Sequence, residues 1–228
     1  MNFHEYIKAT LAGNKEAFIP IIEYYETKLY QALRALGMND SESEKAIVQS
    51  FQHVYHSLPV YNETKPFTDW FLSTAFPPMM DEHQEFVTKQ GEGKRESIAD
   101  CFSSLPKTTQ YALVLENIFD TPLELIANLL KLPTKDVEEI LFDGKWWMAN
   151  FSQKDKLETC LPPKTLFAYQ HKKFTDAQLM EVVDHLEFCP SCREQLRTFE
   201  RQTMELVTFF QAPTFTGSFQ EEILKKIK

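Results

Sequence analysis

The spacing of apolar residues is the feature that most restricts how this chain folds. Between residues 16 and 36, apolar side chains recur every three or four positions, which is the period of one face of an amphipathic helix. These positions are Phe18, Ile21, Ile22, Tyr25, Leu29, Leu33 and Leu36. Runs in which apolar and polar residues alternate are few, and the chain has only 6 glycines. We therefore predict an all-α protein, without a β-rich fold or a glycine-rich phosphate loop.

Breaks in this helical pattern divide the 228 residues into three small helical domains. The first domain covers residues 1–78. A polar linker over 79–97, which contains the sequence Gly-Glu-Gly, separates it from the second domain over 98–151. The third domain covers 152–228 and begins with a short polar stretch. Each unit is expected to fold around helices of its own.

Local sequence features predict where individual helices begin and end. In the first domain, Asp40 and Ser41 are candidate N-caps of a helix over roughly 42–57. The next helix is short and very apolar, and it should end at Pro77 and Pro78 because proline removes a backbone N–H and clashes with the preceding turn.

The second domain contains two short helices with a tight turn between them. Thr121 precedes Pro122 at the expected start of one helix, and Pro133 with Thr134 marks the start of the next. Two helices joined in this way have the dimensions of a helix-turn-helix.

Charge and hydropathy restrict the partners of the chain. The formal net charge is −9 and the pI is about 5.2, whereas nucleic-acid binders usually present a basic face. No apolar run is long enough to span a membrane, and the N-terminus lacks the pattern of a signal peptide. We expect a cytoplasmic protein without membrane contact. In that compartment, its 4 cysteines should be metal ligands or reduced thiols.

His185, Cys189 and Cys192 form the most specific motif of the chain. A Cys-x2-Cys turn at a helix start lets two thiolates converge, and the histidine lies on the same side of the turn. Zn²⁺ prefers four nitrogen or sulfur ligands in a tetrahedron, and Cys160 and His171 are the candidates for the fourth ligand. Such a site would be structural, since no coordination position stays open. The alternatives are reduced thiols beside a surface histidine, or a metal-free dithiol.

No constellation of residues indicates catalysis, so we expect that the protein is not an enzyme. The remaining histidines (His4, His53, His56 and His83) have no serine, cysteine or paired carboxylate at a suggestive spacing. Cys101 is a lone cysteine in an apolar helix, and such residues usually fill a core.

Residues 16–76 resemble the sigma-2 domain of small extracytoplasmic-function (ECF) sigma factors. The chain keeps the order of helix, acidic helix, loop and Phe-x-x-Trp helix. The family's apolar positions are occupied by Phe51, Val54, Tyr55, Phe67 and Trp70.

Residues 98–150 resemble the sigma-4 domain of the same family. Leu105 and Pro106 stand at its Leu-Pro start, and the Glu-Ile-Ala-x-x-Leu motif falls between Glu124 and Leu130, with Leu125 for the isoleucine. The two resemblances imply a sigma-factor core.

The third domain resembles the zinc-binding domain of anti-sigma factors. That family has an upstream Cys or His and then a helix that ends in His-x3-Cys-x2-Cys, followed by Arg or Lys. The resemblance implies zinc ligands Cys160, His185, Cys189 and Cys192, and it favours Cys160 over His171. It leaves open whether the site also senses oxidants, because oxidised thiolates release the ion and the fold loosens.

The charges depart from those of a working sigma factor. The family's second helix of the helix-turn-helix is basic, whereas here residues 136–141 read Asp-Val-Glu-Glu-Ile-Leu. Over 98–150, four lysines stand against eight carboxylates. Because each phosphate contact normally needs a cation, this composition argues against promoter DNA as a partner. RNA polymerase is a doubtful partner too, since Lys45 and Val48 replace the family's Asp and Gln.

These features together predict a transcription regulator that acts by protein–protein contact. The main interpretation is a negative effector of a separate ECF sigma factor, with the zinc-binding domain and a helix over 216–227 as the contact surface. Part of that surface could instead pack on the chain's own sigma-like domains. The alternative is a self-inhibited ECF sigma factor, and a third class is a scaffold without a sigma partner.

Overall fold

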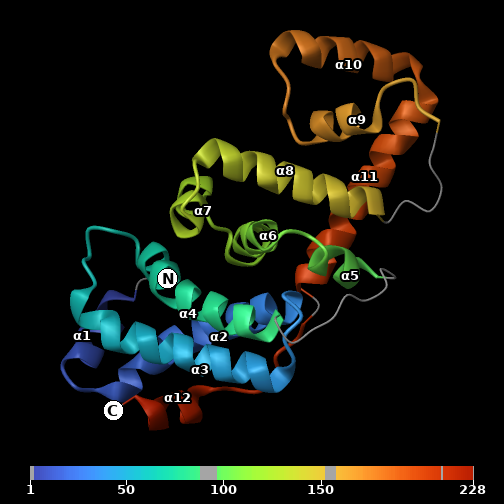
Figure 1. The fold of residues 1–228 in the computed structure, drawn as a ribbon. Coiled ribbons are helices and arrows are strands. Elements are labelled where there is room, and N and C mark those ends of the chain that lie inside the picture. Colours follow the sequence, from blue (N-terminus) through green and yellow to red (C-terminus); the bar gives the residue numbers. More distant parts are fainter. Residues whose placement is uncertain (1–2, 88–96, 152–157, 212, 228) are drawn as a thin grey trace.

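The structure, a computed structural model, describes residues 3–87, 97–151, 158–211 and 213–227. Within those ranges every regular element is a helix, which confirms the all-α prediction (Figure 1). None of these helices has the length and apolar character that a membrane crossing requires. The elements are α1 (His4–Leu11), η1 (Lys15–Phe18), α2 (Ile19–Ala35), α3 (Asp40–Ser57), η2 (Leu58–Val60), α4 (Phe67–Val87), α5 (Ile98–Ser103), α6 (Lys107–Phe119), α7 (Leu123–Leu130), α8 (Thr134–Phe151), α9 (Pro163–Gln170), α10 (Asp176–Phe188), α11 (Pro190–Gln211) and α12 (Gln220–Lys226).

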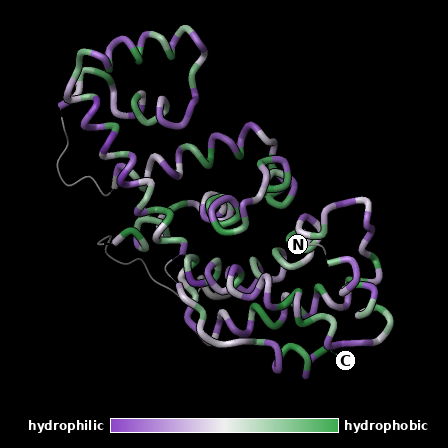
Figure 2. Tube along the Cα trace, turned by 180° about the vertical axis from the view of Figure 1, so that it is seen from behind, coloured by the Kyte–Doolittle hydropathy of each residue, from purple (hydrophilic) through white to green (hydrophobic). Residues whose placement is uncertain are grey.

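Helices α1 to α4 form an N-terminal bundle around an aromatic core. The apolar face predicted for 16–36 is buried, and Tyr25 stacks on Phe71 of α4 with ring centroids 3.7 Å apart. The hydroxyl of Tyr25 is bonded to the Thr68 hydroxyl at 2.9 Å, so its polar end is satisfied. Seen from behind, hydrophobic and hydrophilic stretches alternate along each helix, as amphipathic packing requires (Figure 2).

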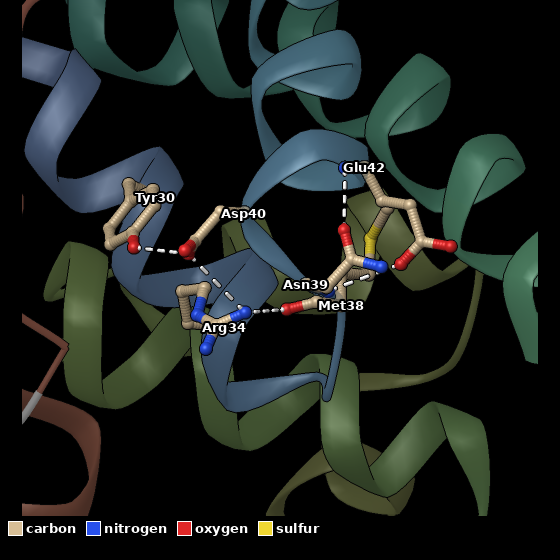
Figure 3. A network of polar contacts seen from close by, with 6 residues as sticks. All are labelled: Tyr30, Arg34, Met38, Asn39, Asp40 and Glu42. Carbon is tan, nitrogen blue, oxygen red and sulfur yellow. Dashed lines mark hydrogen bonds and ion pairs between the residues drawn. The ribbon is translucent and has the colours of Figure 1, made fainter.

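The N-cap of α3 lies one residue before the two predicted caps, Asp40 and Ser41. Asn39 is the N-cap, because its side chain accepts from the N–H of Glu42 at 3.0 Å while the Glu42 carboxylate accepts from the N–H of Asn39 at 3.1 Å (Figure 3). This is a capping box. Asp40 points instead to α2, where it accepts from the hydroxyl of Tyr30 and pairs with Arg34 (Figure 3).

Helix α4 does not end at Pro77 and Pro78, and this corrects the sequence-based prediction. It continues through both prolines to Val87, so residues 79–87 of the expected linker are helical. Pro77 is exposed, whereas Phe76 and Met79 beside the prolines are fully buried. Burial of this apolar face therefore outweighs the backbone hydrogen bonds that the prolines remove. The rest of the expected linker, 88–96, lies outside the described residues.

Helices α5 to α8 form the helix-turn-helix unit. Helices α7 and α8 are joined by three residues, of which Lys131 adopts a left-handed conformation with φ of 56°. Helix α8 begins at Thr134 as predicted and passes through Gly144. A Cβ atom at that glycine would lie 2.6 Å from the Thr109 side chain, so glycine allows α6 and α8 to approach closely.

Helix α11 joins two separate hydrophobic cores. Near its start, Cys192 and Phe199 belong to a small core with α9 and α10, which we call the Cys/His unit. Near its end, Leu206 and Phe210 belong to the large core of the bundle and the helix-turn-helix unit. Its 22 residues span about 33 Å, which is long enough to reach from one core to the other (Figure 1).

Candidate metal centre and the surfaces around it

The structure brings together the four predicted metal ligands. The ligand atoms of Cys160, His185, Cys189 and Cys192 all lie within 4.8 Å of one another. Cys160 comes from the segment before α9, His185 from the last turn of α10, and the other two from the start of α11. Cys192 is buried and Cys160 is exposed, so the cluster lies at the edge of the small core.

Two distances within the cluster are close to those between ligands of a tetrahedral metal site. The sulfur atoms of Cys160 and Cys189 are 3.7 Å apart, and Nε2 of His185 is 3.3 Å from the sulfur of Cys192. Two thiolates bound tetrahedrally at about 2.3 Å from zinc would be about 3.8 Å apart. A disulfide would bring the sulfur atoms to about 2 Å, and none of the four cysteines is in a disulfide. The group is therefore close enough to bind a metal.

The start of α11 also favours a thiolate at Cys189. The backbone N–H of Cys192 donates to its sulfur, and this is the main reason why the pKa of Cys189 is lowered to about 6. The hydrogen bond from Cys160 to the same sulfur raises the pKa of Cys160. Arg193 fixes the turn, because its guanidinium donates to the carbonyl oxygens of Leu186 and Glu187 at 2.7 Å each.

The other candidate residues lie away from this cluster. His171, the rival fourth ligand, packs at a tilt against Phe167 with ring centroids 4.3 Å apart. It does not belong to the cluster of Cys160, His185, Cys189 and Cys192. Cys101 is fully buried, as predicted for a core cysteine. His53 and His56 are exposed on α3.

The Cys/His unit is held against α8 by aromatic rings and two ion pairs. Trp146 of α8 packs on Phe167 and Phe199, with centroids 5.5 and 5.9 Å away. Lys164 pairs with Asp143 at 2.8 Å, and Lys173 pairs with Glu138. The sequence did not reveal these two pairs, because the lysines lie more than 20 residues away from their partners. Two of the carboxylates that make α8 acidic, Glu138 and Asp143, therefore stabilise the packing of the Cys/His unit.

The C-terminal residues 213–227, here called the C-terminal strap, run along the N-terminal bundle. Ile223 and Ile227 are buried in its core, and α12 lies beside α3 (Figure 1). The N–H of Phe219 donates to the Glu26 carboxylate at 3.1 Å, and the ammonium of Lys15 donates to the carbonyl of Ile227 at 3.0 Å. The strap is thus packed on the bundle and hydrogen-bonded to it at Phe219 and at Ile227.

His83 connects the bundle to the helix-turn-helix unit, and no sequence pattern indicated this role. It is fully buried near the end of α4. Its Nδ1 is 2.9 Å from the Tyr111 hydroxyl on α6, and its Nε2 is 3.1 Å from the Leu36 carbonyl oxygen. Burial, and to a lesser degree the charge of Lys107, lowers the pKa of His83 to about 4.

Comparisons with known proteins support the fold. No protein-family model and no curated protein sequence matches the chain. Among solved structures, that of CnrH in complex with the cytosolic domain of CnrY aligns with a TM-score of 0.54 at 19% identity, covering 66% of this chain and 97% of that chain. The aligned share corresponds to about 150 of 228 residues, which is close to the length of residues 1–151, the two sigma-like domains with the segment between them. The chain therefore contains a fold of the sigma-factor kind.

Proposed function

We propose that this chain is a transcription regulator of the sigma/anti-sigma kind, which acts by protein contact as a negative effector of an ECF sigma factor. The surface of α8 is the observation that carries the proposal. It presents carboxylates where the resembled family has cations, and two of them, Glu138 and Asp143, hold the Cys/His unit. A helix that repels phosphate and carries an anti-sigma-like unit suits protein contact better than promoter reading.

The solved neighbour supports a protein partner of the sigma-factor kind, because CnrH is an ECF sigma factor and CnrY is its anti-sigma partner. On the chain itself, α10 offers a contact surface. Met180 and Val183 are 67% and 45% exposed on this helix, with Leu179 beside them. Exposed apolar side chains that gather on one helix are typical of protein-contact surfaces. We propose no catalytic activity for the protein and expect it to act in the cytoplasm, where sigma factors work.

We also propose that the Cys/His cluster holds a structural zinc ion. Three thiolates and one imidazole are the donor set that zinc prefers, and four protein ligands complete its tetrahedron. A bound zinc would tie the segment before α9 to the junction of α10 and α11. That junction fixes the direction in which α11 leaves the Cys/His unit.

A self-inhibited sigma factor is the second candidate function, and one observation favours it. Helix α11 and the strap pack on both sigma-like units of the same chain, where Phe102 contacts Phe209 and Phe210. An anti-sigma-like region engaged in this way would hold the two units together.

Transcription in vitro tests the main proposal and separates it from the second. Core RNA polymerase and an ECF sigma factor from the same cell would be assayed with increasing amounts of the chain under reducing conditions. We expect inhibition near a one-to-one ratio with the sigma factor. The double variant Met180→Glu/Val183→Glu should weaken it, and the control Leu11→Glu, a 51% exposed residue on α1, should not.

Two results would contradict the main proposal. One is the absence of any sigma factor when the chain is purified from its native cell under reducing conditions. The other is salt-sensitive binding to promoter DNA by the chain and core polymerase after the strap has been released. That result would establish the self-inhibited sigma factor instead.

A further inference from the structure

An open groove follows one side of α8, next to the side on which the Cys/His unit packs. It encloses about 640 Å³ and lies between α8 and the start of α6. Its lining residues on α8 include Asp136, Ile140, Asp143 and Trp147, which recur at three- and four-residue intervals along one stripe of the helix. Asp136 and Trp147 are eleven positions apart, which corresponds to about 17 Å along the helix axis. The groove is therefore long enough for three turns of a second helix.

The walls of the groove are apolar and its rim is acidic. Leu105, Pro106 and Ile140 contribute apolar surface, and Trp147 is 45% exposed. The rim carries the exposed carboxylates Asp136, Glu139 and Asp143, of which Asp143 is paired with Lys164. No lysine or arginine is among the lining residues.

From this geometry we infer that the groove binds a basic amphipathic helix of a partner protein. Apolar side chains of that helix lie along Ile140 and Trp147, and its lysines or arginines face the rim carboxylates. The charge complementarity selects this occupant, because an acidic helix or a nucleic-acid backbone is repelled by the same rim. Tryptophan is among the residue types that most often carry binding energy at protein interfaces, and Trp147 is 45% exposed in this groove.

The inference goes beyond the proposed function, because it assigns a second contact surface that is separate from α10. It also does not depend on the identity of the sigma factor. The Cys/His unit covers the neighbouring flank of α8, where Glu138 and Trp146 lie, and reaches the rim of the groove at Asp143. The groove itself is open to a partner.

The test is peptide binding to the full chain, measured by fluorescence anisotropy. The probe is a fluorescein-labelled helical peptide of about 16 residues with leucines on one face and lysines beside them. We expect binding that weakens as salt rises, and no binding of a second peptide with glutamate in place of lysine. Trp147→Ala should weaken binding about 10-fold or more, and Asp136→Asn/Glu139→Gln should weaken it about 5-fold at low salt.

A matched control separates the groove from the overall acidity of the chain. Glu200→Gln/Glu205→Gln removes the same charge from exposed positions of α11 and should change the affinity less than about 2-fold. Thermal unfolding checks that every variant is folded. The inference is overturned if the control weakens binding as much as the groove variant does, if both groove variants bind as the parent does, or if promoter DNA competes for the groove. Inhibition of transcription in the earlier assay would stand in each of these cases.

Discussion

His83 is a fully buried residue whose protonation changes when the chain folds. In the unfolded chain its pKa is near 6.5, whereas in the folded protein it is about 4 because the ring is buried between Leu36 and Tyr111. Between these two values the unfolded state binds more protons than the folded state. Stability is therefore fully present above pH 6.5 and falls as the pH drops towards 4.

Replacement of His83 by glutamine tests this linkage. When the pH is lowered from 7 to 4.5, the His83 linkage should lower the free energy of unfolding of the parent protein by about 2–3 kcal/mol. The variant His83→Gln should lack this part of the pH dependence. Urea unfolding at both pH values measures it. The control His53→Gln, at an exposed position of α3, should behave as the parent does, and an unchanged pH dependence in His83→Gln would contradict the assignment.

The cysteines give a second prediction at this scale. We expect about one zinc ion per chain after purification under reducing conditions, and none in Cys192→Ser, because four-ligand zinc sites depend on every ligand. Metal content is measured by mass spectrometry. Cys101→Ala and His171→Ala should each keep the ion. Loss of zinc from His171→Ala with its retention in Cys192→Ser would point to a different ligand set.

Tertiary packing determines the structure of α4 and the use of α8 more than their local sequences do. Helix α4 contains two prolines yet remains continuous, since its apolar face is buried against α3. Helix α8 uses three faces at once. Val137 and Leu141 enter the large core, Trp146 packs on the Cys/His unit, and Trp147 lines the open groove.

Replacement of a proline in α4 tests how much the prolines lower the free energy of unfolding. Pro77→Ala restores a backbone N–H inside the helix and should raise the unfolding free energy by about 1–3 kcal/mol, since proline is the least favourable residue in a helix interior. Chemical denaturation followed by circular dichroism measures the change. Pro122→Ala, at the N-cap of α7 where the ring is tolerated, should give no such gain. A loss of stability in Pro77→Ala would show that the packing requires the ring.

In the whole molecule, residues 158–211 and 213–227 are divided between two cores. The first part of α11 completes the Cys/His unit, and its last turns with the C-terminal strap complete the core of the sigma-like part. The strap thus returns the C-terminus to the N-terminal bundle (Figure 1). Rearrangement of α11 would therefore disturb both cores together.

Release of the strap gives a prediction at this scale. Ile223→Asp places a charge in a fully buried position and should destabilise the protein by about 2–5 kcal/mol. The strap should then be cleaved faster by a protease, while the helix content of the remainder is kept. Met204→Asp, at a 65% exposed position of α11, should leave the cleavage rate unchanged. Equal cleavage of both variants would mean that the strap is not held by Ile223.

The sequence by itself determined the features that depend on neighbouring residues. Helical periodicity predicted the helix over residues 16–36, and the spacing of His185, Cys189 and Cys192 predicted residues that the fold indeed brings together. The acidic character of α8 was also evident, because charge is a property of composition.

Only the tertiary structure decided the features that depend on burial between distant segments. It carried α4 through Pro77 and Pro78, made Asn39 rather than Asp40 the N-cap of α3, and buried His83 between two units. It also divided α11 between two cores. Local patterns cannot predict these outcomes, because the free energy that selects them comes from apolar surface and polar partners supplied by residues far away in the chain.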